Sequence, residues 1–268
     1  MLTEAEKMLI CGKSSAIHQD IELLDRVLAI LDCLEGSQML SLTEIAHRTN
    51  LPKPTCFRLL QAMQRNYLVR QEGRYYGLGS RMYSYVFSSI MHQPLRRTVK
   101  PFLQKLSRET HLSSLLFVRH GAFRVAIAME EWDHGGEEYV DIGQVGVIYA
   151  GSPSKVLMAW LSKPQRDAVL AEVTWVPLTT NTLASRNEYE EECLRIRKTG
   201  WAISRGEREP TAFSISTPVR DQTGVVIAAL TLTGLLSELN DSCVPIWVKS
   251  LLESSRALSS RLGYVDRT

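Results

Sequence analysis

The segment from Ser41 to Tyr76, SLTEIAHRTNLPKPTCFRLLQAMQRNYLVRQEGRYY, constrains the fold of this chain more than any other. Its first residue and Glu44 have the spacing of a capping box, which predicts the start of a helix. Residues 50–52 break the apolar pattern, and Pro54 suits the first turn of a second helix ending near residue 65. Two short helices, a tight turn and a following basic hairpin predict a winged helix-turn-helix, a fold that reads double-stranded DNA.

The second predicted helix has one apolar and one polar face. Leu59, Leu60 and Met63 lie on the face expected toward the core, while basic and amide side chains share the other. The hairpin around Glu72-Gly73 is predicted to be the wing, with two arginines at its tip. Arginine can bind a guanine edge through two hydrogen bonds, and lysine or hydroxyl groups reach phosphates. The candidate DNA-contacting residues are Ser41, Lys53, Thr55, Arg58, Gln61, Arg65, Arg70 and Arg74.

Charge is strongly segregated along the chain. The stretch from Arg48 to Lys100 holds ten basic residues and one acidic residue, which gives it a formal charge of +9. The whole chain has a formal net charge of +2, so the remaining residues together carry −7. A local cationic surface favours DNA binding through release of counterions. The alternative is an ordinary helical domain with a solvated basic face.

Length and composition indicate two domains without membrane spans. The chain has 268 residues, 44% of them hydrophobic, which suffices for two cores. It contains no run of about 18 apolar residues, and acids in its first residues argue against a secretory signal, so we expect a soluble, cytoplasmic protein. The five cysteines are scattered, and the acidic Gly-Gly segment at 133–138 is typical of a solvated turn, so we expect no metal and no cofactor.

The chain is predicted to divide into four parts. Residues 1–19 form a flexible tail, 20–80 the DNA-binding domain, 81–98 a linker helix, and 99–268 an effector-binding and oligomerisation domain. Within the DNA-binding domain, a helix that ends at Gly36 should pack under the two predicted helices of the helix-turn-helix through an apolar stripe. The stripe consists of Ile21, Leu24, Val27, Leu28, Leu31 and Leu34.

The last part alternates helices with strands. Two apolar runs flank a turn at His120-Gly121, and a Gly-Ser-Pro-Ser-Lys segment leads into a helix expected from Val156. Further helices are expected from Pro101, from Ser185 to Gly200, and over residues 244–262. Strands at 213–219 and 225–233 are joined by a short turn. We therefore predict an α+β domain with a mostly antiparallel sheet.

Several motifs in order resemble the IclR-type bacterial transcription regulators over nearly the whole chain. The DNA-reading segments are 42–46 (LTEIA), 51–55 (LPKPT) and 58–60 (RLL), and 75–79 (YYGLG) resembles the exit from the wing. The second half matches at 143–157, 200–202 (GWA), Glu207 and 215–234. The resemblance implies a homodimer or homotetramer whose GAF-like C-terminal domain binds a small organic effector, commonly a carboxylate or an aromatic metabolite. Effector binding would adjust affinity for a DNA operator.

The residues themselves agree with an effector pocket in that domain. The turn at Gly151 to Ser154 offers backbone N–H groups at a helix start, which favour an anion. Alternating hydroxyl residues on two neighbouring strands place each pair on one face of the sheet. The resemblance carries the pocket over to Ser152, Pro153, Ser204, Ser214, Thr231 and Thr233. The chain departs from the family at Ser204, where an acid is common, and at Ser154 and Thr211, where glycine is usual.

Three alternatives remain at this stage. The hydroxyl groups could merely satisfy strand edges and helix caps, and the second domain could serve only for oligomerisation. Residues 152–155 are also literally Ser-x-x-Lys and 198–200 Lys-Thr-Gly, two of the three signatures of penicillin-recognising serine acyltransferases. The third signature, Ser-Asp-Asn, is absent. The Lys-Thr-Gly segment falls at the predicted end of a helix, so we expect no enzyme and no catalytic residue.

Overall fold

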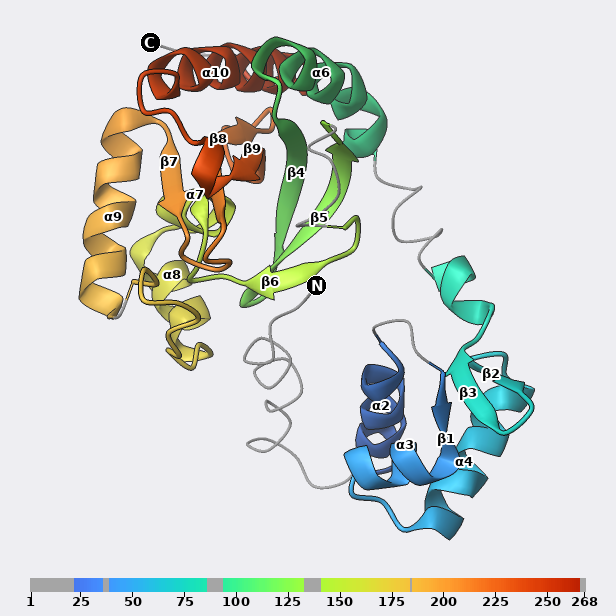
Figure 1. Cartoon of the computed structure of the whole chain (residues 1–268). Coiled ribbons are helices and arrows are strands. Elements are labelled where there is room, and N and C mark those ends of the chain that lie inside the picture. The colour runs from blue at the N-terminus through green and yellow to red at the C-terminus, as the bar shows by residue number, and fades with distance from the viewer. Residues whose placement is uncertain (1–21, 36–38, 86–93, 133–140, 184, 266–268) are drawn as a thin grey trace. The chain divides into compact units, whose positions relative to one another are not determined.

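The computed structural model describes residues 22–35, 39–85, 94–132, 141–183 and 185–265 (Figure 1). Contacts divide the chain into two compact units, with the boundary between Gln93 and Pro94. The predicted tail at 1–19 lies outside the described residues, as does the segment at 133–138. Of the predicted linker helix, residues 81–85 are helical and 86–93 are not described, so its extent stays a prediction.

The N-terminal unit is a winged helix-turn-helix, as predicted. Its elements are α2 (Glu22–Leu34), β1 (Leu40–Ser41), α3 (Leu42–Arg48), α4 (Lys53–Arg65), β2 (Val69–Glu72) and β3 (Tyr75–Leu78). The strands form an antiparallel sheet in the order β1-β3-β2. The core includes Ile30, Ile45, Cys56 and Leu60, all fully buried, so α2, α3 and α4 each contribute to it.

Local chemistry explains where the two reader helices begin and end. Glu44 donates its backbone N–H to Oγ of Ser41 over 3.4 Å, and its carboxylate accepts the Ser41 backbone N–H over 2.8 Å. This confirms the capping box. Asn50 follows α3 with a positive φ of 52°, which stops the helix, and Pro54 sits in the first turn of α4.

The apolar stripe expected along α2 is only partly right. Its C-terminal half packs as predicted, with Leu34 buried and Val27 and Leu31 partly buried against the core. Leu24 and Leu28, however, are 48% and 46% exposed. At about 100° per residue, these two leucines lie to one side of the helix face that buries Ile30 and Leu34, so their side chains are turned away from the core. The spacing of apolar residues predicts which side of a helix is apolar, but a residue is buried only where another element packs on it.

The C-terminal unit contains a six-stranded sheet in the order β6-β5-β4-β9-β8-β7, and every neighbouring pair is antiparallel. The strands are β4 (Ser113–His120), β5 (Phe123–Glu130), β6 (Val145–Val147), β7 (Ala202–Arg205), β8 (Ala212–Arg220) and β9 (Val226–Leu235). The helices are α6 (Pro94–Thr110), α7 (Ser152–Ala159), α8 (Lys163–Ala171), α9 (Arg186–Thr199), the 3-10 turn η1 (Leu236–Glu238) and α10 (Val244–Arg261). The predicted α+β class and antiparallel sheet are confirmed.

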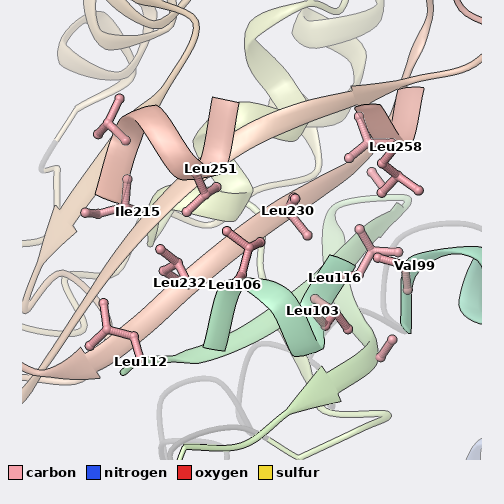
Figure 2. Close-up of a cluster of buried hydrophobic side chains, with 14 of the residues drawn as sticks. Val99, Leu103, Leu106, Leu112, Leu116, Ile215, Leu230, Leu232, Leu251 and Leu258 are labelled. Atoms are coloured by element: carbon pink, nitrogen blue, oxygen red, sulfur yellow. The ribbon is translucent and has the colours of Figure 1, made fainter. Parts of the chain in front are cut away.

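The two faces of this sheet have different partners. Helices α6 and α10 pack on one face and enclose an apolar core with alternate residues of the strands (Figure 2). Core side chains shown there include Val99, Leu103, Leu106, Leu116, Ile215, Leu230, Leu232, Leu251 and Leu258. Helix α7 packs on the other face, with α9 against it (Figure 1). Because side chains alternate along a strand, the residues between these core positions face α7.

Two helix starts differ from the sequence prediction. The helix expected after Pro101 begins at Pro94 and continues through the internal proline. A proline at the first position of a helix costs no hydrogen bond, so Pro94 is compatible with this start. The helix expected from Val156 begins at Ser152, so the Ser-Pro-Ser-Lys segment is its first turn and not a loop. Helix α8 was not predicted.

Candidate DNA-reading surface and effector pocket

Helix α4 presents a polar face opposite its buried one. Cys56, Leu59, Leu60 and Met63 are buried. The side chains predicted to face outward are exposed at Lys53, Arg58, Gln61 and Arg65, and half-buried at Thr55. The helix therefore carries a continuous cationic and amide surface of the type that enters a major groove. Phe57, which the sequence analysis did not single out, is also 41% exposed on this helix.

The wing places its two arginines differently from the prediction. Arg74 lies in the turn beside Gly73, whose φ is 61°, so this arginine is at the tip as expected. Arg70 lies opposite Gly77 within the hairpin and forms an ion pair with Glu72, so its placement at the tip was wrong. The turn contains only two residues, which leaves room for a single arginine. An exposed ion pair is weak and leaves Arg70 able to contact phosphate.

Ser41 has a structural role that competes with its predicted DNA contact. Its hydroxyl donates to the Glu44 carboxylate over 2.6 Å while accepting the backbone N–H of the same residue. The hydrogen bond from the Ser41 side chain, with a second from its backbone, holds the pKa of Glu44 below its usual value. The hydroxyl is thus already engaged in capping α3.

In the C-terminal unit, the sheet face toward α7 carries the predicted hydroxyl groups together. Ser214 lies opposite Thr233 and Ser216 opposite Thr231, so the four side chains share one face of β8 and β9. A pocket opens on this face. Its lining residues are Leu115, Phe117, Arg124, Gly151, Pro153, Ser204, Arg208, Glu209, Ala212, Phe213, Ser214, Thr231 and Thr233.

Five of the six residues predicted for the effector line this pocket, and Ser152 is not among the lining residues. Its Oγ instead forms hydrogen bonds of 2.8 Å to Oγ of Ser214 and 2.7 Å to Oγ of Ser216. Ser216 in turn bonds Oγ1 of Thr231 over 2.8 Å. The hydroxyl chain holds the first turn of α7 against β8 and positions the pocket wall.

The anion-favouring start of α7 already has an anion. Glu207 accepts the backbone N–H of Gly151 through Oε2 over 3.1 Å. Its other oxygen accepts Nζ of Lys155 over 2.5 Å, and the same lysine donates to the Ile203 carbonyl over 2.8 Å and lies 3.3 Å from Oε1 of Glu192. The lysine side chain is 3% exposed. The prediction of free N–H groups at this turn was therefore wrong for Gly151.

Neighbouring charged side chains also set the ionisation state of Glu192. Burial raises the pKa of this carboxyl, but the hydrogen bond from Arg195 and the charge of Lys155 outweigh burial and lower it below the usual value. Glu192 is therefore ionised at neutral pH, and the buried cluster around Lys155 contains two carboxylates.

The Ser-x-x-Lys segment forms part of this structural cluster. A serine acyltransferase needs its lysine within reach of the nucleophile, whereas Lys155 donates to Glu207 and Ile203 and Ser152 bonds the two strand serines. The Lys-Thr-Gly segment ends α9, with Gly200 in the left-handed conformation at a φ of 82°. Neither the Ser-x-x-Lys segment nor the Lys-Thr-Gly segment has the geometry that a serine acyltransferase requires.

Sequence reasoning missed the charged lining of the pocket. Arg124 and Arg208 are 5% and 8% exposed, and Glu209, which follows Arg208 in the sequence, also lines the pocket. Cζ of Arg124 lies 4.8 Å from the centre of the Phe117 ring on the neighbouring strand. The available signal was an arginine inside the apolar strand RVAIA, a residue type that is seldom buried without a specific role.

The described part of the chain lacks two features. None of its helices is both long and apolar enough to cross a membrane. Within the same residues, no three histidine, cysteine, aspartate or glutamate side chains gather in a way that could hold a metal ion.

A winged helix-turn-helix with an exposed basic helix, followed by a domain with a lined pocket, defines a transcription regulator. Comparison with protein families agrees. Residues 23–73 match the IclR helix-turn-helix domain and residues 87–260 match the C-terminal domain of bacterial IclR transcriptional regulators. The chain belongs to the IclR family.

Individual relatives cover almost the whole chain. The regulator XynR of Escherichia coli is 31% identical over 250 residues, which are 91% of this chain and 98% of XynR. A crystal structure of a transcriptional regulator from Rhodococcus sp. RHA1 is 25% identical with a TM-score of 0.75, and the match covers 91% of this chain and 98% of the other. An IclR homologue from Microbacterium hydrocarbonoxydans complexed with 4-hydroxybenzoate has the same TM-score at 19% identity, over 90% and 99% of the two chains.

Proposed function

We propose that this regulator binds a double-stranded DNA operator with an affinity set by a small organic metabolite, a carboxylate or an aromatic compound, in its C-terminal pocket. The observation that carries the proposal is the pocket itself, in which buried hydroxyl groups and charged side chains converge beside the start of α7. A homologue of the same fold was crystallised with 4-hydroxybenzoate, which supports binding of a small acid by this fold.

On the DNA side, α4 would enter the major groove and the wing would contact the backbone. Arg58 in the middle of the exposed face is placed to read a base, whereas Lys53 at the helix start suits a phosphate. Thr55, Gln61 and Arg65 complete the proposed contact face of α4. Arg74 at the wing tip and Arg70 behind it would add backbone contacts.

We further propose that the protein works in the cytoplasm as a homodimer or homotetramer. One recognition helix reads few base pairs, and two copies related by a two-fold axis double the length of the site. The proposal includes no catalytic step and no cofactor, in accord with relatives that are transcription regulators.

The test measures DNA binding and metabolite binding on the full chain. The DNA probe is the region upstream of the gene that encodes this protein. Fluorescence anisotropy then gives the affinity for this operator DNA with and without each compound of a metabolite panel. Because coupling between two sites is reciprocal, the operator must change metabolite affinity by the same factor. Operator binding that no compound alters would instead favour a C-terminal domain that serves only for oligomerisation.

A further inference from the structure

Phe57 is a large apolar side chain on the outer surface of α4. It is exposed, whereas Cys56 and Leu60 of the same helix are fully buried. Its ring belongs to neither of the two apolar cores, and it takes part in none of the ring contacts found among the described residues. Packing within the N-terminal unit therefore does not account for an aromatic side chain at this position.

The helix places this ring within the surface proposed to enter the major groove. Lys53 lies four residues before Phe57 and Gln61 four residues after it, so the three side chains form one row along α4. Arg58 lies about 100° further around the helix, with Gln61 between it and Phe57. Phe57 is also in the N-terminal half of α4, the part of such a helix that reaches base edges. Side chains proposed to contact DNA thus surround the ring.

The charge around Phe57 favours a nucleic acid over a second copy of the chain. Helix α4 contains Lys53, Arg58 and Arg65 and has no aspartate or glutamate. If this surface met the same surface of another copy, like charges would be brought together, which costs free energy. A polyanion is instead attracted to it. The partner of the ring must therefore offer an apolar group within strongly anionic surroundings.

The major groove of DNA contains such a group. Of the four bases, only thymine presents an apolar group there, its C5-methyl. Contact with an aromatic ring removes the methyl group from water, and burial of one methyl group changes an equilibrium constant by about fourfold. A polar base edge placed against the same ring would lose hydrogen bonds to water without replacement. An apolar ring in the groove therefore distinguishes thymine from the other bases.

We propose that Phe57 is a specificity-determining residue that contacts the C5-methyl group of a thymine in each half-site of the operator, an inference that rests on the proposed DNA binding. Arg58 then reads one base through hydrogen bonds, and Phe57 reads a thymine through apolar contact. Because the two residues are adjacent on one helix, the two bases lie close together in the half-site. At the thymine position, uracil or cytosine lowers affinity.

Removal of single methyl groups from the DNA tests this contact without changing the protein. The probe is the duplex that the full chain protects in a footprint of the region upstream of its own gene. Each thymine in turn is replaced by deoxyuridine, which pairs in the same way but lacks the methyl group, and anisotropy titrations measure affinity. We expect about three- to fivefold weaker binding at one thymine of each half-site. At that position 5-methylcytosine paired with guanine should bind more tightly than cytosine paired with guanine.

Three variants assign the methyl contact to Phe57. Phe57→Ala should bind the thymine and uracil duplexes equally, because the ring that distinguishes them is absent. Phe57→Leu keeps an apolar side chain and should retain part of the difference. Gln64→Ala changes another exposed side chain of α4 and is the control, which should retain the whole difference. Melting curves and sedimentation establish that each variant is folded and keeps its assembly state.

The outcomes separate the inference from the proposed function. Equal binding of the thymine and uracil duplexes at every position would overturn the methyl contact. A difference that persists in Phe57→Ala would assign the contact to another residue and overturn the role of Phe57. A Phe57→Ala chain that keeps this difference but loses its assembly state would place the ring between two copies of the chain. In each case operator binding leaves the proposed function standing, whereas a chain that binds no DNA from the upstream region contradicts that function itself.

Discussion

At the scale of single residues, Arg58 and Lys53 should contribute to DNA binding in different ways. Both are exposed on α4, with the arginine in the middle of the helix and the lysine in its first turn. We expect Arg58→Ala to lose about 1–3 kcal/mol of discrimination between operator and random DNA, because a base contact specifies sequence. Lys53→Ala should weaken both DNAs alike and reduce the salt slope by about one unit.

Anisotropy titrations at several salt concentrations measure both quantities. Gln64→Ala on the same helix is a suitable control, since it changes an exposed side chain without a charge. An Arg58→Ala protein with unchanged preference for its operator would show that another residue reads the bases.

The helix cap at Ser41 should matter for stability and should depend on pH. Ser41→Ala is expected to cost about 1 kcal/mol at neutral pH, because it removes the side-chain cap of α3. The pKa of Glu44 is lowered in the folded state, chiefly by the Ser41 side chain, from its usual value of 4.5. Its contribution is therefore present above pH 4.5 and is lost as the pH falls through the lower folded value.

Urea unfolding of both proteins at neutral pH and near pH 3 measures this dependence. Ser41→Thr, which retains a hydroxyl, serves as the control. The difference between the original chain and Ser41→Ala should shrink in acid, and an equal difference at both pH values would mean that the carboxylate takes no part in the cap.

At the scale of elements, one buried cluster fastens α7 to the rest of its unit. Lys155 on this helix contacts Glu207 after β7 and Glu192 on α9. Lys155→Met should destabilise the unit by about 3–5 kcal/mol, because it leaves buried carboxylates without their cation. The double change Lys155→Met with Glu207→Gln should recover part of that loss.

Thermal and chemical unfolding measure the cost, and Lys198→Met on the exposed end of α9 is the control. A Lys155→Met protein as stable as the control would show that solvent or a neighbouring residue compensates the carboxylates.

At the scale of the whole molecule, the operator should reflect the symmetry of the assembly. For a two-fold dimer we expect a near-palindrome with half-sites centred about one helical turn apart, roughly 34–36 Å, or a multiple of it. Footprinting together with analytical ultracentrifugation tests this. A monomer that binds a single half-site tightly would contradict both the proposed assembly and the symmetric site.

Several features of the fold could be predicted because their causes are local. The Ser41 capping box, the break at Asn50 and the turn after Glu72 depend on residues within a few positions of each other. The shared face of Ser214 and Ser216 follows from strand alternation, and its pairing with β9 follows from a short connecting turn. Such interactions are nearly independent of the rest of the chain.

The remaining features depend on contacts between distant parts of the chain. Burial of Arg124 follows from glycines at 146 and 151, and the anion at the start of α7 comes from Glu207, which is 56 residues away from Gly151. Exposure of Leu24 and Leu28 depends on which face of α2 the rest of its unit covers. The sequence alone determined most of the elements, the faces of the strands and the resemblance to the family, because these follow from neighbouring residues. Only the tertiary structure decided which charges meet in the pocket, because packing between separate elements sets those distances.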